Sequence, residues 1–330
     1  MGAPEPMTWA QSLEVNYTDG ILVLHRGCIV YERYFGALSP AALHIAFSVT
    51  KSFVATIAAS LIAESVLDEG AAVASYVPEL KDSGLGDATI RNLLDMTTGL
   101  RFSENYADPA SPFWDFCRAN GFLPRPSEYS GPETSHAYLR TLGKEYPHGE
   151  RFVYKTVNTD VLAWAMSRVT GLPVAELLRQ RIWTRLGVEQ DAGFTVDPDR
   201  TEFAGAGLNL TLRDLARFGD MMRLGGRYNG QQIVPAAAID DIRRGGNREL
   251  FAAAGYRTLA GWSYRNMWWI SHNPHGAFTA RGIHGQAIYI DPTAAMVIAR
   301  FASHPLAANM NLDPTSLPAY QALAAHLMSG

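Results

Sequence analysis

Short runs of apolar, β-branched and aromatic residues near both ends of the chain predict β-strands. Near the start, Ile21–His25 and Cys28–Phe35 are separated by an Arg-Gly pair, which predicts a β-hairpin. Near the end, Gln286–Asp291 and Ala295–Ala302 flank a Pro-Thr pair and predict a second hairpin. The simplest arrangement joins both hairpins in one antiparallel sheet covered by helices.

Between the two hairpins, apolar residues recur at helical spacing. They predict a helix from about Ser48 to Ser65, whose buried face contains Phe53, Val54, Ile57, Ala58, Leu61 and Ile62. From Gly70 to about Arg200 the pattern changes to short helices with many turns. The expected helices there are Thr89–Met96, Thr159–Val169 and Val174–Leu186, and Leu317–Met328 is expected to form a terminal helix.

These elements predict an α+β fold, an antiparallel sheet flanked by helices with a mostly helical insertion. Residues 1–70 and 200–330 are expected to form the sheet domain together, and residues 71–199 the helical domain. A cleft between the two domains is the natural place for an active site. The stretch 106–132 is rich in proline and glycine and predicts either a lid over this cleft or a surface loop.

Composition limits the possible partners. Hydrophobic residues make up 47% of the 330 residues and the net charge is −4, as in an ordinary globular protein, and no basic patch indicates a nucleic-acid partner. No apolar stretch is long enough to span a bilayer and the start of the chain lacks a signal-peptide pattern, so a cytoplasmic location without membrane contact is expected.

Neither cysteines nor histidines indicate a metal or cofactor. Cys28 and Cys117 are the only cysteines and lie far apart, which predicts reduced thiols. His272, His275 and His284 lack an acidic partner at ligand spacing. We therefore expect no metal site and no cofactor.

The tetrapeptide Ser48-Val49-Thr50-Lys51 carries the first sign of chemistry. Lysine occurs only four times in the chain, so Lys51 is unusual, and positions i and i+3 of a helix lie on one face. The amino group of Lys51 can therefore reach the Ser48 hydroxyl and act as the base that makes it a nucleophile. A serine at a helix start is more often only a cap, so the tetrapeptide alone leaves both interpretations open.

A second segment gives the tetrapeptide a family context. The segment 152–160, which contains Tyr154-Lys155-Thr156, resembles the Tyr-x-Asn region of the serine β-lactamase and penicillin-binding protein superfamily, whose members also carry Ser-x-x-Lys. The stretches Thr89–Leu100 and Arg181–Val188 resemble further segments of its class C-related hydrolases. The resemblance covers about residues 20 to 305 and implies the β-lactamase/transpeptidase-like fold.

Departures from the family pattern indicate the substrate class. Thr156 replaces the asparagine of Tyr-x-Asn, and the Lys-Thr-Gly motif of β-lactamases has no clear match. Ala280-Arg281-Gly282 stands in its place, which removes the lysine expected to bind a β-lactam carboxylate. By these features the chain is most similar to 6-aminohexanoate-dimer hydrolases and family VIII carboxylesterases, which cleave linear amides or esters.

The resemblance implies roles for individual residues. Ser48 would be the nucleophile of an acyl-enzyme, and Lys51 and Tyr154 would share the proton transfers, with Lys51 beside the phenol if Tyr154 is to act as a base. The backbone N–H groups of Ser48 and Ile283 would form the oxyanion hole. The expected substrate-binding residues are Tyr106, Thr156, Asn209, Gly282, His284 and Trp268.

Three of these residues have an alternative structural interpretation. Tyr106 aligns with a loop tyrosine that contacts the scissile amide in the oligomer hydrolases, but it could be a packed loop aromatic. Asn209 could line the pocket or cap the helix that begins near Thr211. Trp268, with Trp269 and Phe278, could shape an acyl pocket or belong to the core.

The leading hypothesis is a monomeric or homodimeric serine hydrolase for small amides or esters. A β-lactamase or penicillin-binding activity is the alternative within the same fold. A non-catalytic ligand-binding protein on the same scaffold is the alternative from another class, and it would be expected to have lost one of Ser48, Lys51 and Tyr154.

Overall fold

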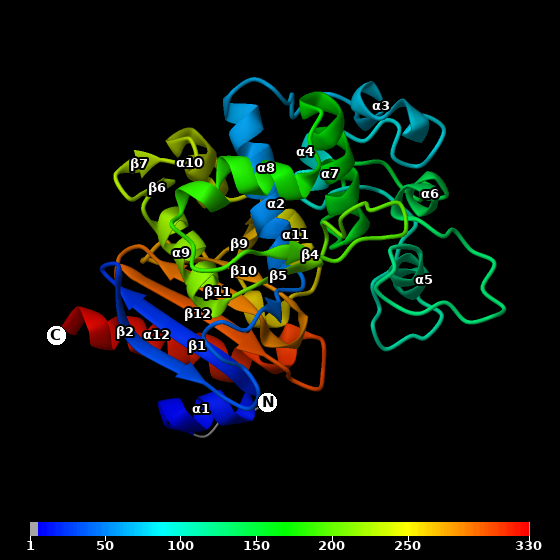
Figure 1. Ribbon diagram of the computed structural model, residues 1–330. Helices are drawn as coiled ribbons and strands as arrows, with labels where there is room; N and C mark the ends of the chain where they lie inside the picture. The colour runs from blue at the N-terminus through cyan, green and yellow to red at the C-terminus, as the bar shows by residue number, and fades with distance from the viewer. Residues whose placement is uncertain (1–5, 330) are drawn as a thin grey trace.

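An antiparallel seven-stranded sheet forms the centre of the computed structural model, which describes residues 6–329 (Figure 1). The strand order is β2-β1-β12-β11-β10-β9-β8. The strands are β1 (Thr18–His25), β2 (Cys28–Tyr34), β8 (Ser263–Arg265), β9 (Trp268–Ile270), β10 (Phe278–Arg281), β11 (Ala287–Asp291) and β12 (Met296–Ala302).

Both predicted hairpins are confirmed, and they pair with each other. Strand β1 lies beside β12 with Ile21 opposite Arg300, so residues from the two ends of the chain occupy neighbouring positions. Strands β1 and β2, and likewise β11 and β12, are antiparallel neighbours. The antiparallel sheet with helices on both faces confirms the α+β class.

Alternating side chains of β1 divide the core between the two faces of the sheet. Ile21 and Val23 point to the face covered by α1 (Trp9–Val15) and α12 (Asp313–Ser329). Leu22 and Leu24 point to the face covered by α9 (Leu212–Arg223) and α2 (Val49–Ala63). In Figure 1, α1 and α12 lie together below the sheet and the other helices lie above it.

Helix α2 is buried along most of its length and matches the predicted helix from Ser48 to Ser65 closely. Three other predictions differ at their ends. The helix expected over Val174–Leu186 ends at Arg181, where Ile182 leaves helical geometry, and a 3₁₀ turn (Trp183–Arg185) follows. The terminal helix begins at Asp313 and includes Pro318, and the helix expected over Thr89–Met96 is confined to Ile90–Leu94.

The remaining elements lie above the sheet or at its margin. The helices are α3 (Val73–Tyr76), α4 (Ile90–Leu94), α5 (Pro112–Ala119), α6 (Ser135–Arg140), α7 (Val157–Thr170), α8 (Val174–Arg181), α10 (Ala236–Arg244) and α11 (Arg248–Ala253). Two small sheets consist of β3 (His44–Ile45), β5 (Leu208–Leu210) and β4 (Gly193–Phe194), and of β6 (Arg227–Tyr228) and β7 (Gln231–Gln232).

One apolar core extends from the sheet into the helical part. The same cluster contains Leu22 of β1, Phe53 of α2 and Leu162 of α7. Strand β4 lies within residues 71–199 but pairs with β5, which lies outside them. The division into residues 71–199 and the rest therefore stays a prediction.

An ion-pair network attaches α4 to the turn between β8 and β9. Arg265 donates to Asp95 at 2.8 Å and to Asp241 at 2.8 Å, and Arg91 donates to Asn266 at 2.6 Å. Charges held by several partners and partly shielded from water contribute more than isolated surface pairs. The network thus fixes the helical part against the sheet.

Within residues 6–329, no single helix is long and apolar enough to cross a membrane. The helices Val157–Thr170 and Val174–Arg185 are together long and apolar enough to cross a membrane, but they are bent by 70° where they meet.

Helix α9 approaches the sheet closely at Gly219. A Cβ atom there would lie 2.7 Å from Ile288 Cγ2 and 2.7 Å from Val297 Cγ1. These distances are too short for carbon atoms, so any side chain would push the helix away from β11 and β12.

We expect Gly219→Ala to lower the free energy of unfolding by about 1–3 kcal/mol, because overpacking outweighs the gain of about 1 kcal/mol in helix propensity. Urea unfolding followed by circular dichroism measures the change. Gly143→Ala is the matched control, because a Cβ atom at Gly143 meets no atom within 4 Å. Equal urea concentrations at the unfolding midpoint of the two variants would contradict this account of the packing.

Candidate active site

Ser48 occupies the N-cap position of α2, but its side chain makes no capping hydrogen bond. It therefore does not act as an ordinary cap. The preceding residue, Phe47, has a φ of 45°, which a bulky side chain adopts only when its surroundings enforce it. This backbone geometry turns the chain from β3 into α2 and leaves Ser48 8% exposed.

Lys51 lies one turn further along α2 and is 1% exposed. Its Nζ donates to Ser48 Oγ at 3.0 Å and to the carbonyl oxygen of Gly205 at 2.7 Å. Burial lowers the pKa of Lys51 to about 8, although the carboxylates of Glu104 and Asp160 favour its charged form. A lysine whose pKa is lowered in this way gives up its proton more readily than an exposed lysine, which suits a base beside a hydroxyl.

Tyr154 is the third member of the group. Lys51 Nζ lies 5.0 Å from the centre of its ring, which stacks on Trp269 with ring centres 5.8 Å apart. Burial, and then the charge of Glu104, raise the pKa of Tyr154 well above 10, and the Ser48 hydroxyl only partly offsets them. Tyr154 is therefore a neutral phenol near pH 7, which can donate a proton but is a poor base.

Lys155 anchors the segment that carries Tyr154. Its buried amino group donates to the carbonyl oxygens of Thr98 and Leu100, both at 2.8 Å, and to Tyr146 Oη at 3.0 Å. Burial lowers the pKa of Lys155 to about 8. Lys155 thus has a structural role, although it directly follows the tyrosine of the motif.

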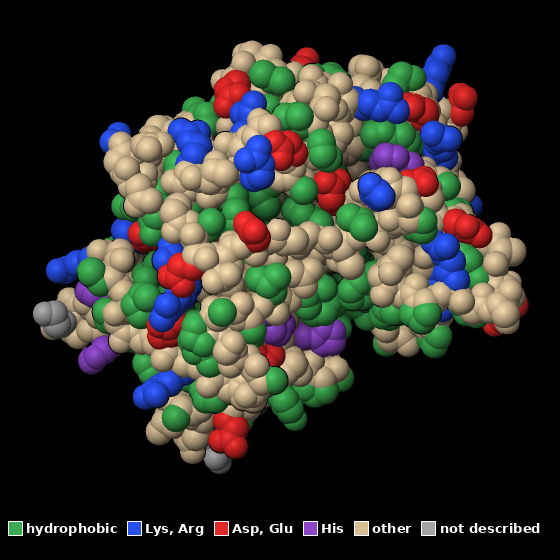
Figure 2. Space-filling model, viewed as in Figure 1, with side chains coloured by type: hydrophobic (Ala, Val, Ile, Leu, Met, Phe, Trp, Pro, Cys, Tyr) green, Lys and Arg blue, Asp and Glu red, His purple; other side chains and the backbone are tan. Residues whose placement is uncertain are grey.

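A cleft of about 870 Å³ opens above Ser48. Its size suits a small organic substrate. Figure 2, viewed as in Figure 1, shows hydrophobic side chains on the surface beside the region around α5. The aromatic residues that line the cleft are Phe47, Tyr106, Phe113, Trp114, Phe122, Tyr154, Phe203, Tyr256 and Trp269.

Four of the predicted substrate-binding residues line this cleft: Tyr106, Thr156, Gly282 and His284. The Tyr106 hydroxyl donates to Glu104 Oε2 at 3.0 Å, and its ring packs edge-on against Phe113. Tyr106 is therefore both a packed loop residue and part of the cleft wall. Its contact with a substrate stays a prediction.

Glu104 is a cleft residue that the sequence motifs do not reveal. Besides the Tyr106 hydroxyl, it accepts a hydrogen bond from the backbone N–H of Thr156. Burial raises the pKa of its carboxyl group, and the charge of Lys51 opposes this shift. The position 104 lies 53 residues from Lys51 in sequence, in an irregular loop, and no spacing rule links the two.

The turn from Gly282 to His284 lies against Ser48. A Cβ atom at Gly282 would lie 2.7 Å from the carbonyl oxygen of Ala46 and 3.1 Å from Ser48 N, so only glycine allows this approach. Among the described residues, no acceptor bonds the backbone N–H of Ser48 or of Ile283. Both groups are therefore available to an oxyanion.

His284 has a defined tautomer. Its Nδ1 lies 2.7 Å from the carbonyl oxygen of His304, and since that oxygen can only accept, Nδ1 carries the hydrogen. The neutral ring then has Nε2 as an acceptor, and it packs against Phe47 with ring centres 5.4 Å apart.

Two of the expected substrate-binding residues, Trp268 and Asn209, do not line the cleft. Trp268 is 0% exposed, and its Nε1 donates to Thr56 Oγ1 at 3.2 Å within the core. Side chains alternate along a strand, so the next residue of β9, Trp269, faces the cleft instead. Asn209 lies on β5 and donates to the carbonyl oxygen of Gly207 at 2.9 Å, outside the cleft, and the cap of α9 is Thr211.

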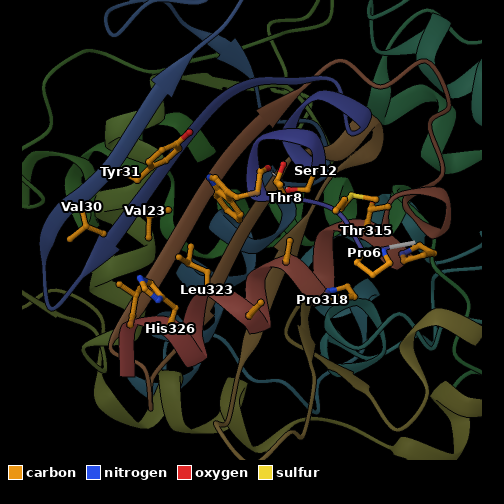
Figure 3. A pocket seen from close by; sticks show the side chains of 16 residues that line it. Pro6, Thr8, Ser12, Val23, Val30, Tyr31, Thr315, Pro318, Leu323 and His326 are labelled. Carbon is orange, nitrogen blue, oxygen red and sulfur yellow. Dashed lines mark hydrogen bonds between the residues drawn. The ribbon is translucent and has the colours of Figure 1, made fainter. Parts of the chain in front are cut away.

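A second cavity of about 620 Å³ lies on the opposite face of the sheet, between α1 and α12 (Figure 3). Ser12 is the serine in its wall, and the Ser12 hydroxyl donates to the carbonyl oxygen of Trp9 at 2.7 Å. Among the described residues that line it, there is no lysine to activate that hydroxyl. Over residues 6–329, no group of three His, Cys, Asp or Glu residues is placed to hold a metal ion.

Comparisons with known proteins agree with this geometry. Residues 15–315 match the family model described as Beta-lactamase. A 6-aminohexanoate-dimer hydrolase of Paenarthrobacter ureafaciens is 36% identical over 296 residues, covering 89% of this chain and 75% of the relative.

Solved structures extend the likeness to three dimensions. A protein from Bacillus anthracis, proposed to be a 6-aminohexanoate-dimer hydrolase, has a TM-score of 0.89 and 35% identity, covering 98% of this chain and 83% of the other. A family VIII carboxylesterase has a TM-score of 0.67 and 16% identity, covering 94% of this chain and 95% of the esterase. It shares the fold.

We expect Lys155→Met to lower the free energy of unfolding by about 2–3 kcal/mol, because two buried carbonyl oxygens lose their donor. Urea unfolding measures the loss. Lys81→Met removes an exposed lysine and is expected to change the free energy of unfolding by less than about 0.5 kcal/mol. If both variants unfold at the wild-type urea concentration, Lys155 does not anchor this segment.

Proposed function

Because this chain belongs to the beta-lactamase family of serine hydrolases, we propose that it cleaves small linear amides or carboxylic esters through an acyl-enzyme on Ser48. The observation that carries the proposal is the 3.0 Å hydrogen bond between Lys51 Nζ and Ser48 Oγ, with Tyr154 beside both and an aromatic cleft above them.

In the first step, Ser48 Oγ attacks the carbonyl carbon of the substrate while its proton passes to Lys51. The lowered pKa of Lys51, about 8, supports this role. Tyr154 then gives its phenolic proton to the leaving nitrogen or oxygen and regains one from Lys51. The raised pKa of Tyr154 supports a role as proton donor rather than as phenolate base.

In the second step, water attacks the acyl carbon and returns a proton to Ser48 Oγ through the same two groups. In both steps the negative charge on the carbonyl oxygen would be held by the backbone N–H groups of Ser48 and Ile283. Donors held in place before the reaction need no rearrangement, and each is worth about 10²–10³ in rate.

The cleft supports a linear substrate. The relative at 36% identity is named for hydrolysis of the 6-aminohexanoate dimer, a linear amide. Tyr106 and Thr156 lie on the wall beside Ser48, where they could contact the scissile group. We propose these two residues, with Gly282 and His284, as the substrate contacts.

A β-lactamase or penicillin-binding activity is the second candidate, since the family model carries that name. Among the described residues of the cleft there is no lysine, and the one arginine, Arg281, is already paired with Asp313. A β-lactam carboxylate would therefore lack a free cation on this strand. A non-catalytic binding protein would not need Ser48, Lys51 and Tyr154 in contact.

We also propose a cytoplasmic location and a monomeric or homodimeric state. The two free cysteines, of which Cys28 is exposed, support a reducing compartment. Cell fractionation and light scattering of the purified protein measure these properties.

We expect Ser48→Ala to abolish turnover of a short-chain nitrophenyl ester and of a linear ω-amino-acid dimer, and to prevent the mass increase of a trapped acyl-enzyme. Product release and intact-mass spectrometry give the two readouts. Ser60→Ala, at a buried serine of the same helix that bonds Glu64, is the matched control and should remain active. Turnover that survives Ser48→Ala excludes the mechanism, and rapid cephalosporin turnover with neither ester nor amide cleavage excludes the substrate class.

We expect Gly282→Ala to lower kcat/KM on the same ester by about 10²-fold, because the new methyl group would displace the Ile283 N–H from the oxyanion. Steady-state kinetics measure the loss. Gly193→Ala, where a Cβ atom meets no atom within 4 Å, should retain wild-type kinetics. Wild-type kcat/KM in Gly282→Ala would rule out this turn as part of the oxyanion hole.

A further inference from the structure

Asp160 is a buried carboxylate close to the active site that the proposed mechanism does not use. It lies in the first turn of α7 and is 4% exposed. It is not among the residues that line the cleft, so no substrate in the cleft would contact it. Within residues 6–329, no side chain bonds either of its oxygens. A carboxylate in such a place is costly unless a positive charge lies near it.

The backbone of Gly205 separates Asp160 from Lys51. On one side, the Gly205 carbonyl oxygen accepts the 2.7 Å hydrogen bond from Lys51 Nζ. On the other side, a Cβ atom at Gly205 would lie 2.8 Å from Asp160 Oδ2 and 2.3 Å from Thr156 Cγ2. The absence of a side chain at position 205 therefore lets the carboxylate and the lysine approach the same peptide group.

Lys51 is the cation that faces Asp160. Burial raises the pKa of Asp160 to about 8, while the charge of Lys51 and the backbone N–H groups of Gly205 and Ala204 lower it, so Asp160 ionises over the same pH range in which Lys51 loses its proton. The other ionisable groups that face Lys51 are Glu104 and Cys117, and the ring of Tyr154 lies beside it. Glu104 lines the cleft, whereas Asp160 does not.

The two carboxylates differ in what else they bond. Glu104 already accepts hydrogen bonds from Tyr106 and from the N–H of Thr156. Asp160 has no such side-chain partner. When it is ionised, Asp160 has only backbone N–H groups to bond, so its charge acts on Lys51 through a short path of low dielectric constant.

We propose that Asp160 is a positioning residue for acyl transfer, which stabilises the ammonium group formed on Lys51 when that lysine takes the proton of Ser48; this inference rests on the function proposed above. The proton that leaves Ser48 Oγ ends on Lys51 Nζ, and none moves to Asp160 in this step. In its ionised form, the Asp160 carboxylate supplies the opposite charge beside the Gly205 peptide. It thereby sets the pH at which Lys51 becomes a base.

The test is the pH profile of kcat/KM for ester cleavage by Asp160→Asn, which removes the charge and keeps the shape. In the wild type, the rate should rise with pH as Lys51 loses its proton. Without the carboxylate the ammonium form is less stable, so the midpoint of this rise should fall by about one pH unit. At the same time kcat should fall about tenfold or more while KM changes less than about threefold.

The NMR signals of lysine labelled with carbon-13 at Cε, followed as a function of pH, give a second readout that does not depend on turnover. The chain has four lysines, so the Lys51 signal can be assigned by its loss in Lys51→Met. Its titration midpoint should fall in Asp160→Asn by the same amount as the kinetic midpoint. Asp197→Asn is the matched control, because Asp197 is also buried but bonds the backbone of Ser135 and Thr201, and it should leave the Lys51 midpoint unchanged.

Three results would overturn the proposal: an unchanged Lys51 midpoint in Asp160→Asn, an equal shift in Asp197→Asn, or a loss of kcat without a shift. Asp160→Ser, also uncharged and smaller, replaces the Asn variant if that variant does not fold. Loss of the fold in both variants would assign Asp160 to the architecture and equally overturn the proposal. Since Ser48→Ala tests the nucleophile separately, failure here leaves the proposed hydrolase activity standing.

Discussion

The enclosure of the Lys51 amino group is the constraint on which the site depends. An amino group out of contact with water must either lose its charge or find partners for it. Here burial dominates and lowers the pKa, and two carboxylates limit the decrease. The hydroxyl of Ser48 and the carbonyl of Gly205 satisfy its hydrogen bonds. The lysine can therefore change its protonation state at a lower pH than an exposed lysine does.

The rest of the fold keeps the Lys51 amino group buried. The Lys51 amino group bonds Ser48 at the start of α2 and Gly205 in the segment before β5, and the ring of Tyr154, from the segment before α7, lies beside it. The Arg265 network fixes α4 against the β8-β9 turn, and Ser52 of α2 donates to the Met267 carbonyl in the same region at 2.8 Å. Local chemistry at one amino group therefore depends on contacts that span most of the sequence.

Features within a few residues of one another could be predicted from the sequence. The hairpins, the α2 helix and the Ser48–Lys51 hydrogen bond all follow from spacing along the chain. Which of Trp268 and Trp269 faces the cleft could not be read from the sequence, because a shift of one residue reverses the face of a strand.

Features that depend on long-range packing could not be predicted. Glu104, Asp160 and Gly205 lie 53, 109 and 154 residues from Lys51 in sequence, and no local pattern connects them. The left-handed backbone at Phe47 likewise has no signal in a bulky residue type. The family resemblance located the motifs, but only the folded chain shows which charges face them.

The groups of the site come from separate parts of the framework, and this separation has an evolutionary consequence. The proposed nucleophile, Ser48, and its proposed base, Lys51, lie at the start of a single helix, α2, so their mutual geometry is inherited as one rigid unit. Tyr154 comes from the segment before α7, and Ile283, the proposed oxyanion donor, follows β10. Substitutions that change the cleft wall without reaching Lys51 or the two carboxylates that face it can therefore alter which leaving group is accommodated while the proposed activation of Ser48 is retained. Such a division lets one ancestral attack step be reused against chemically different bonds.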